Sequence, residues 1–282
     1  MTGTTSTGRQ AIVRGGGLGY RVKLELEIIS HASEIDWLEL VADQFLPVSG
    51  PRREKLAGLA ALRPCVTHSL DLSLGGWAPL DMEYLAGVIA VGDAVGAPWF
   101  SDHLCFSRDA DVTIGHLAPV AFTAASARHV AERAAFAQQY AGRPLLLENI
   151  TYSFAVGSEL SEAEFIAEVV EQADCGLLLD VNNLYTNSVM HGYDAAGFLD
   201  RIPMERVGQL HLAGGRWIDG TLEDSHDAPV PAEVWELARE IAGRSPAGAI
   251  MIERDDDFPD DFGELLAEVA AARQLASLAA GG

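Results

Sequence analysis

The chain has 282 residues, a formal net charge of −22 at neutral pH and 49% hydrophobic residues. This length and composition suit one α/β barrel or two smaller domains with sizeable cores. With 19 Lys and Arg residues against 41 Asp and Glu, the sequence lacks the basic surface that nucleic-acid binding requires. It also contains neither an apolar run of membrane-spanning length nor a signal peptide, so we expect a cytoplasmic protein without a membrane partner.

Eight short apolar segments predict β-strands. A short apolar run bounded by polar residues or Gly is typical of a strand that is buried on both faces. The segments are 17–21, 36–40, 63–70, 98–104, 143–149, 176–183, 207–214 and 248–255. From the second segment onwards, each contains near its end a side chain that can bind a metal or transfer a proton: Glu39, His68, His103, Glu148, Asp180, His211 and Glu253.

Segments of helical length and period separate these strands. The clearest are 81–96, 122–142, 161–173, 231–243 and a terminal helix at about 265–279. Ser161, followed by Glu164, predicts a capping box, and Gly96, Gly142 and Gly243 are expected at helix ends. Pro231 suits a first helical turn.

Eight strand–helix units are the number that closes a (β/α)₈ (TIM) barrel. No linker or low-complexity segment divides the chain, so we predict a single barrel domain over 13–280, preceded by a disordered segment, 1–12. In such a barrel the carboxyl ends of all strands meet on one face, where the active site lies. The polar side chains near the strand ends are therefore expected to lie close together.

These side chains together predict a metal site. Buried carboxylates and imidazoles without partners are costly, and a shared cation removes that cost. Because the rim offers more donors than the roughly six that fill an octahedral site, more than one ion is expected. The segment 221–230 adds Asp224 and His226 on a predicted loop after the seventh strand, where metal or phosphate sites are often built.

The order and spacing of several motifs resemble those of the multinuclear non-haem iron-dependent oxidative enzymes, a family that includes the iron subunit that makes methanobactin. The motifs are THSLDLSLGG, SDHL, GRPLLLEN, CGLLLDVNNLY, HGYD, VGQLHLAG, DSHDAPV and IERDDDFP, and they extend from about residue 17 to 270. The resemblance implies a TIM-barrel enzyme that uses O₂ and two or three irons, mixed Fe(II)/Fe(III), to oxidise residues, chiefly Cys, in a ribosomally made precursor peptide. Imidazole and carboxylate ligands also suit Zn²⁺ and Mn²⁺, so only the resemblance selects iron.

The resemblance also implies roles for individual residues. The implied metal ligands are His68, His103, Glu148, Asp180, Asn183, His211, Asp224, His226 and Glu253. Asp255 is expected to handle protons or support the ligands, and Asp180 is also counted as catalytic. We further expect Asn182, His191 and Glu39 to contact the substrate.

The sequence leaves three functional questions open. The resemblance implies a separate partner protein that binds the leader part of the precursor peptide, and the alternative is a barrel that binds its peptide alone. A second reading is a divalent-metal, xylose-isomerase-like barrel that acts on a sugar or another small metabolite. A third is a non-catalytic metal-binding subunit. Metal identity and oxygen consumption separate the oxidative enzyme from the isomerase-like barrel and from the metal-binding subunit.

Overall fold

The computed structural model describes residues 13–110 and 112–279. The disorder expected for residues 1–12 lies outside the described residues. Among the described helices, none combines the length and the apolar character needed to cross a membrane.

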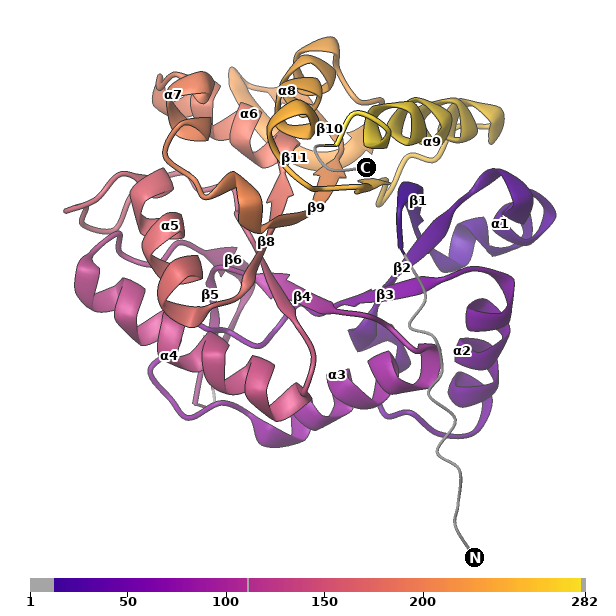
Figure 1. Ribbon diagram of the computed structural model, residues 1–282, viewed down its shortest axis with the longest axis horizontal. Helices are drawn as coiled ribbons and strands as arrows, with labels where there is room; N and C mark the ends of the chain where they lie inside the picture. The colour runs from indigo at the N-terminus through magenta and orange to yellow at the C-terminus, as the bar shows by residue number, and fades with distance from the viewer. Residues whose placement is uncertain (1–12, 111, 280–282) are drawn as a thin grey trace, which may run out of the picture.

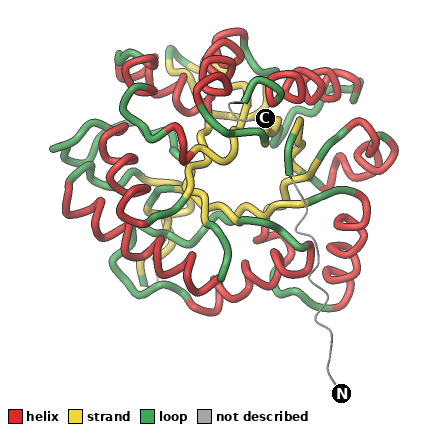
Figure 2. The backbone as a smooth tube through the Cα atoms, viewed as in Figure 1, coloured by secondary structure: helices red, strands yellow, loops and turns green. Residues whose placement is uncertain are grey.

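Eight parallel strands form a closed barrel (Figure 1). Each strand pairs with its neighbours along the chain, and the first strand closes the ring by pairing with the last. Figure 2 shows the strands as an inner ring with helices around it. The predicted barrel is confirmed, and its strands are β1 (Gly15–Gly19), β2 (Trp37–Val41), β3 (Cys65–His68), β4 (Phe100–His103), β7 (Leu145–Glu148), β8 (Gly176–Asp180), β9 (Val207–Leu212) and β12 (Ala249–Ile252).

The α-helices are α1 (Glu25–Ser30), α2 (Gly50–Leu62), α3 (Met82–Val95), α4 (Ala124–Ala141), α5 (Glu162–Ala173), α6 (Val181–His191), α7 (Ala195–Leu199), α8 (Ala232–Arg244) and α9 (Gly263–Ala276). Short 3₁₀ turns lie at Val22–Leu24, Ala32–Glu34, Ala42–Phe45 and Met204–Arg206. Ser161 and Glu164 form the predicted capping box of α5. Gly96 and Gly142 end their helices in the left-handed conformation, whereas Gly243 lies inside α8, which continues to Arg244.

Two hairpins extend the barrel beyond the carboxyl ends of its strands. The first, β5 (Phe106–Asp109) and β6 (Val112–Ala118), follows β4, and the second, β10 (Gly214–Ile218) and β11 (Thr221–Ala228), follows β9. The loop predicted at 221–230 is therefore mostly a strand. The end of the strand predicted at 176–183 is also wrong, since α6 begins at Val181 because the Asp180 carboxylate accepts the backbone N–H of Asn183 and caps the helix.

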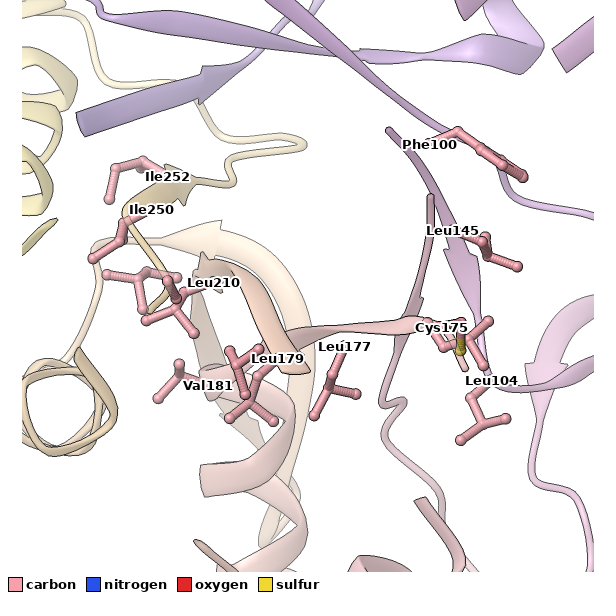
Figure 3. Close-up of a cluster of buried hydrophobic side chains, with 14 of the residues drawn as sticks. Phe100, Leu104, Leu145, Cys175, Leu177, Leu179, Val181, Leu210, Ile250 and Ile252 are labelled. Carbon is pink, nitrogen blue, oxygen red and sulfur yellow. The ribbon is translucent and has the colours of Figure 1, made fainter. Parts of the chain in front are cut away.

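Alternation along each strand separates the core from the interior of the barrel. In β7, Leu145 and Leu147 belong to the large cluster between strands and helices. Figure 3 draws part of this cluster along β8, β9 and β12. The alternate residues face the interior of the barrel, where Trp37, Val66 and Met251 belong to a smaller apolar cluster.

Candidate metal centre

The candidate site is the next layer of inward-facing side chains. Two residues beyond Trp37, Val66 and Met251, the same faces of the chain carry the polar residues of the site. Consecutive barrel strands thus contribute Glu39, His68, His103, Glu148, Asp180, His211 and Glu253, with Glu253 directly after β12. Potential ligands among these residues, together with His226 and Asp255, form three groups whose donor atoms lie within 4.8 Å of one another in each group.

The first group contains His68, His103 and Glu148. The Nε2 atoms of the two histidines lie 3.4 Å apart, and Glu148 Oε2 lies 3.4 Å from His68 Nε2 and 3.6 Å from His103 Nε2. A metal bound tetrahedrally at ordinary Zn–N distances holds its ligand atoms about 3.4 Å apart. Ser101 Oγ lies 2.8 Å from His68 Nδ1 and fixes the ring with Nε2 toward the group.

The second group contains Glu148, Asp180, His211 and Glu253. His211 Nδ1 lies 3.3 Å from Glu148 Oε1 and 3.1 Å from Glu253 Oε2. Glu148 therefore turns one oxygen toward the first group and the other toward the second. A carboxylate in this position can bridge two cations.

The third group contains His226, Glu253 and Asp255. His226 Nδ1 lies 3.4 Å from Glu253 Oε2 and 3.6 Å from Asp255 Oδ2. Because Glu253 also belongs to the second group, the three groups form one continuous row. His226 has a positive φ of 48°, an uncommon conformation for a non-Gly residue that is often found at functional sites.

A chain of hydrogen bonds below the site orients His211. Trp99 Nε1 donates to Gln209 Oε1 at 2.8 Å, so that Gln209 Nε2 donates to Glu39 Oε2 at 2.5 Å. Glu39 Oε1 lies 3.0 Å from His211 Nε2. With its Nε2 proton directed to Glu39, His211 keeps the Nδ1 lone pair toward the second group.

Burial and charge shift the pKa values of the site strongly. Burial lowers the pKa of His103 to about 4 and keeps its imidazole neutral, as a metal ligand requires. Burial alone would raise the pKa of Glu148, but His211, His103 and His68 together hold it near 2. Burial and the nearby Asp224 raise the pKa of Asp180 well above its usual value. Carboxyl groups thus crowd a buried space, and burial together with the neighbouring carboxylates disfavours the ionised form of Asp180.

Unpaired polar atoms show that the residues fit a metal centre. The buried side-chain N and O atoms without a hydrogen-bond partner in the described part of the chain include Glu148 Oε2, Asp180 Oδ2, Asn183 Oδ1 and His211 Nδ1. Such atoms cost free energy unless a ligand satisfies them. Nitrogen and carboxylate donors at these separations suit transition-metal ions.

Two predicted ligands lie beside the three groups. Asn183 donates its side-chain N–H to the Asn149 carbonyl oxygen, which leaves its buried Oδ1 available to a cation. Asp224 Oδ1 lies 2.6 Å from His226 Nε2, on the side of the ring away from Nδ1, and accepts a hydrogen bond from Asn182 at 2.6 Å. Asp224 therefore contacts the ring of a potential ligand, and metal binding by Asp224 and Asn183 stays a prediction.

The three residues predicted to contact substrate lie elsewhere. Glu39 is 2% exposed and contacts Gln209 and His211. Asn182 is buried against Asp224, and His191 stacks on Tyr152 on the outer surface, with Nε2 donating to the Tyr152 carbonyl oxygen. None of the three is among the described residues that line the main cavity above the site.

That cavity has a volume of about 800 Å³ and opens over the three groups. Its walls include Thr113, His116 and Leu117 of β6, and Ser225 of β11. Arg21 is the only Lys or Arg among the described residues that line it, and its guanidinium donates to Glu253 and to Asp255. The two hairpins therefore shape the space in which a substrate would lie.

Sequence reasoning missed several residues that support the site. Arg21 is the last residue of the first predicted strand and lies two residues beyond the end of β1, and Gln209 lies two residues before His211 on the same face of β9. The side chain of Asn149 forms hydrogen bonds with both the N–H and the carbonyl oxygen of Asp180. It thereby connects β7 and β8 just beyond their last paired residues. The two-residue period could have indicated Gln209 and Ser101, because each precedes a predicted ligand by two residues.

Comparison with known proteins gives a family and several relatives. The model of the family described as RiPP precursor modification enzyme MbnB/TglH/ChrH matches residues 15–277. A UPF0276 protein of Anaeromyxobacter sp. (strain Fw109-5) is 39% identical over 272 residues, which cover 94% of this chain and 95% of the relative. A UPF0276 protein of Bordetella pertussis is 37% identical over 271 residues, covering 94% and 93% of the two chains.

Among solved structures, endonuclease IV from Thermus thermophilus aligns with a TM-score of 0.61 at 19% identity, covering 93% of this chain and 99% of that one. D-psicose 3-epimerase from Clostridium cellulolyticum aligns with a TM-score of 0.59 at 14% identity, covering 95% and 100%. At these identities the likeness shows the barrel fold alone.

Proposed function

From the premise that this chain belongs to the MbnB/TglH/ChrH family of RiPP precursor modification enzymes, we propose that it oxidises Cys residues of a precursor peptide with iron and O₂. A RiPP is a ribosomally synthesised peptide that enzymes modify after translation. The observation that supports the proposal best is the row of three ligand groups joined by Glu148 and Glu253. A site for a single cation would not need two shared carboxylates.

The chain's own residues would hold two or three irons in this row. His68 and His103 face one end, His211 and Asp180 the centre, and His226 and Asp255 the other end. We include Asn183 as a supporting ligand because its buried Oδ1 has no hydrogen-bond partner, and Asp224 because its Oδ1 lies 2.6 Å from Nε2 of the potential ligand His226. When bound, the irons supply the redox chemistry with O₂ and the affinity for a thiolate sulfur.

The protein contributes binding, orientation and proton transfer. The cavity receives the peptide between the two hairpins and brings a Cys side chain down to the rim of the barrel. Asp255 lies at the boundary between cavity and third group, and its Oδ2 is placed to accept the thiol proton. Arg21 binds Asp255 Oδ1 and Glu253 Oε1, so it holds both carboxylates in place while they act.

The substrate implies a setting for the reaction. A peptide made on ribosomes meets the enzyme in the cytoplasm, where we place this protein. We also propose that a separate partner protein binds the leader part of the peptide. The described residues outside the barrel are chiefly the two short hairpins and the loops, which support no independent peptide-binding domain.

Coexpression with a short Cys-containing peptide encoded beside its gene tests the proposal. We expect an oxygen-dependent change of peptide mass that disappears when each Cys is replaced by Ser, and that needs iron in the medium. The Asp255→Asn variant, which keeps the shape of the side chain, should slow the reaction even when the rate is expressed per bound iron, because Asp255 also belongs to the third ligand group. Modification that proceeds without O₂, or equally in the Ser peptide, would refute the oxidation of Cys.

A further inference from the structure

A second cavity of about 530 Å³ lies on the other side of the loop that connects β7 with α5. Thr151 of this loop lines the metal cavity, and the next residue, Tyr152, lines the second one. Aromatic rings dominate its wall: Phe122, Tyr152, Tyr193 and Phe198. The two cavities therefore share one loop as a wall.

A buried carboxylate lies at the bottom of this cavity. Glu162, in the first turn of α5, lines the cavity and is 8% exposed. Tyr152 and Tyr193 donate their hydroxyls to its Oε2 at 3.2 and 3.1 Å, and Asn187 Nδ2 donates to Oε1 at 3.2 Å. Since a carboxylate offers about four acceptor positions, one of them is left on Oε1.

No described Lys, Arg or His forms an ion pair with Glu162; every partner named above is neutral. Arg201 also lines the cavity, but its guanidinium donates to the Gly197 carbonyl oxygen. Burial raises the pKa of Glu162 to about 7, as expected for a carboxylate without a counter-charge. A cation bound beside Glu162 would favour its ionised form.

We propose that this second cavity binds a basic side chain, Lys or Arg, of the precursor peptide. The hydrocarbon part of such a side chain packs against aromatic rings, which also attract its cationic end, and Glu162 then provides a charge-assisted hydrogen bond. The net charge of −22 favours a basic ligand in addition. A peptide that crosses the shared loop can contact both cavities at once.

This inference rests on the proposed function for the identity of its ligand, but it is tested without metal or oxygen chemistry. The probe is Nα-acetyl-lysine N-methylamide, titrated into the purified protein and followed by amide chemical shifts. The neutral analogue is Nα-acetyl-norleucine N-methylamide, and putrescine represents free polyamines. The variants are Glu162→Gln and Ala155→Trp; Ala155 is an exposed residue of the cavity wall, and tryptophan there would fill the cavity without touching the buried network.

We expect the lysine probe to bind about tenfold or more tightly than the norleucine probe, with shifts centred on α7 and the shared loop. Glu162→Gln and Ala155→Trp should each remove this preference, whereas Glu171→Gln, the same change at an exposed position of α5, should retain it. If Glu162→Gln does not fold, Ala155→Trp decides. Equal binding of the two probes, shifts elsewhere, or unchanged binding in Ala155→Trp would overturn the inference. Tighter binding of putrescine than of the lysine probe would show that the cavity takes a free polyamine and not a side chain of the peptide. Failure of either kind leaves the oxidation of Cys untouched, because that reaction is measured separately.

Discussion

Glu39, which does not line the main cavity, illustrates how a single buried side chain can act on the site through its neighbours. It accepts hydrogen bonds from Gln209 and His211. Because Trp99 donates to the amide oxygen of Gln209, the amide N–H₂ of Gln209 must be the group that faces Glu39. A carboxylate accepts at both oxygens, whereas an amide accepts at only one. The arrangement therefore requires Glu at position 39 if Nδ1 of His211 is to face the second group of potential ligands.

We predict that Glu39→Gln lowers metal affinity by roughly 10- to 100-fold, the usual effect of removing a partner of a metal-binding His. The side-chain N–H₂ of Gln would face one of the two donors and turn His211 away from the second group. Anaerobic equilibrium dialysis with Fe(II) measures the affinity. Glu54→Gln, an exposed position on α2, is the matched control, and wild-type affinity in Glu39→Gln would contradict the assigned role.

Glu162 leads to a prediction about pH. Burial raises its pKa from 4.5 to about 7 in the folded protein, so between these values the folded state binds more protons than the unfolded state. The contribution of Glu162 to the free energy of unfolding is therefore fully present below about pH 4.5. It is lost as the pH rises through about 7, by about 3 kcal/mol in total. In Glu162→Gln this loss is absent.

Urea unfolding of wild type and Glu162→Gln at several pH values between 5 and 8 measures the effect. We expect the variant to gain stability relative to wild type with increasing pH, while Glu171→Gln follows wild type. A difference between Glu162→Gln and wild type that does not change with pH would show that the carboxylate titrates normally.

At the scale of elements, the junction between β8 and α6 has two functions. Asp180 Oδ1 caps α6 by accepting the Asn183 N–H at 2.6 Å. Asp180 Oδ2 is buried beside the other potential metal ligands and has no hydrogen-bond partner. The strand thus ends, the helix begins and the site gains a donor at one residue. The sequence GLLLDVNN predicted the strand and the donor but not the helix start, because its apolar run resembles a continuing strand.

Two substitutions separate these functions. Asp180→Asn keeps a good helix cap and removes a buried carboxyl group whose ionisation the site disfavours, so the metal-free protein should be at least as stable as wild type. Asp180→Ala removes the cap as well and should cost about 1 kcal/mol. Both variants should bind less metal. Thermal unfolding of the metal-free proteins and metal analysis check the prediction, and equal stability of the two variants would contradict the capping role.

The hairpins were the least predictable elements. The apolar residues Val112, Ile114 and Leu117 do not keep a two-residue period, so the alternation that indicates a half-buried strand is not maintained, and nearly all of residues 112–118 are exposed. The β10–β11 hairpin combines site residues with a turn, and its motif DSHDAPV was interpreted as a loop. Both hairpins line the cavity, so elements that shape this cavity are those for which the sequence carries the weakest structural signal.

At the scale of the whole molecule, the repeating strand–helix pattern predicted the barrel, and the barrel predicted which distant residues would meet. Glu39, His68, Glu148 and Glu253 are far apart in sequence, yet their places near strand ends were sufficient to locate the layer. The residues that hold this layer in place, such as Gln209 and Arg21, could not be predicted, because their contacts depend on which side chains face one another across the barrel. The sharing of Glu148 and Glu253 between groups likewise follows only from three-dimensional distances.

The most direct test of the account is metal analysis of the protein purified from iron-supplemented cells, combined with a Mössbauer spectrum of the same sample. We predict two or three irons per chain in spin-coupled or neighbouring sites, and fewer in Glu148→Gln and Glu253→Gln, because each variant removes a shared ligand. One zinc or manganese per chain, with no iron taken up after anaerobic reconstitution, would contradict the multinuclear iron centre and favour a single-metal barrel of the isomerase type.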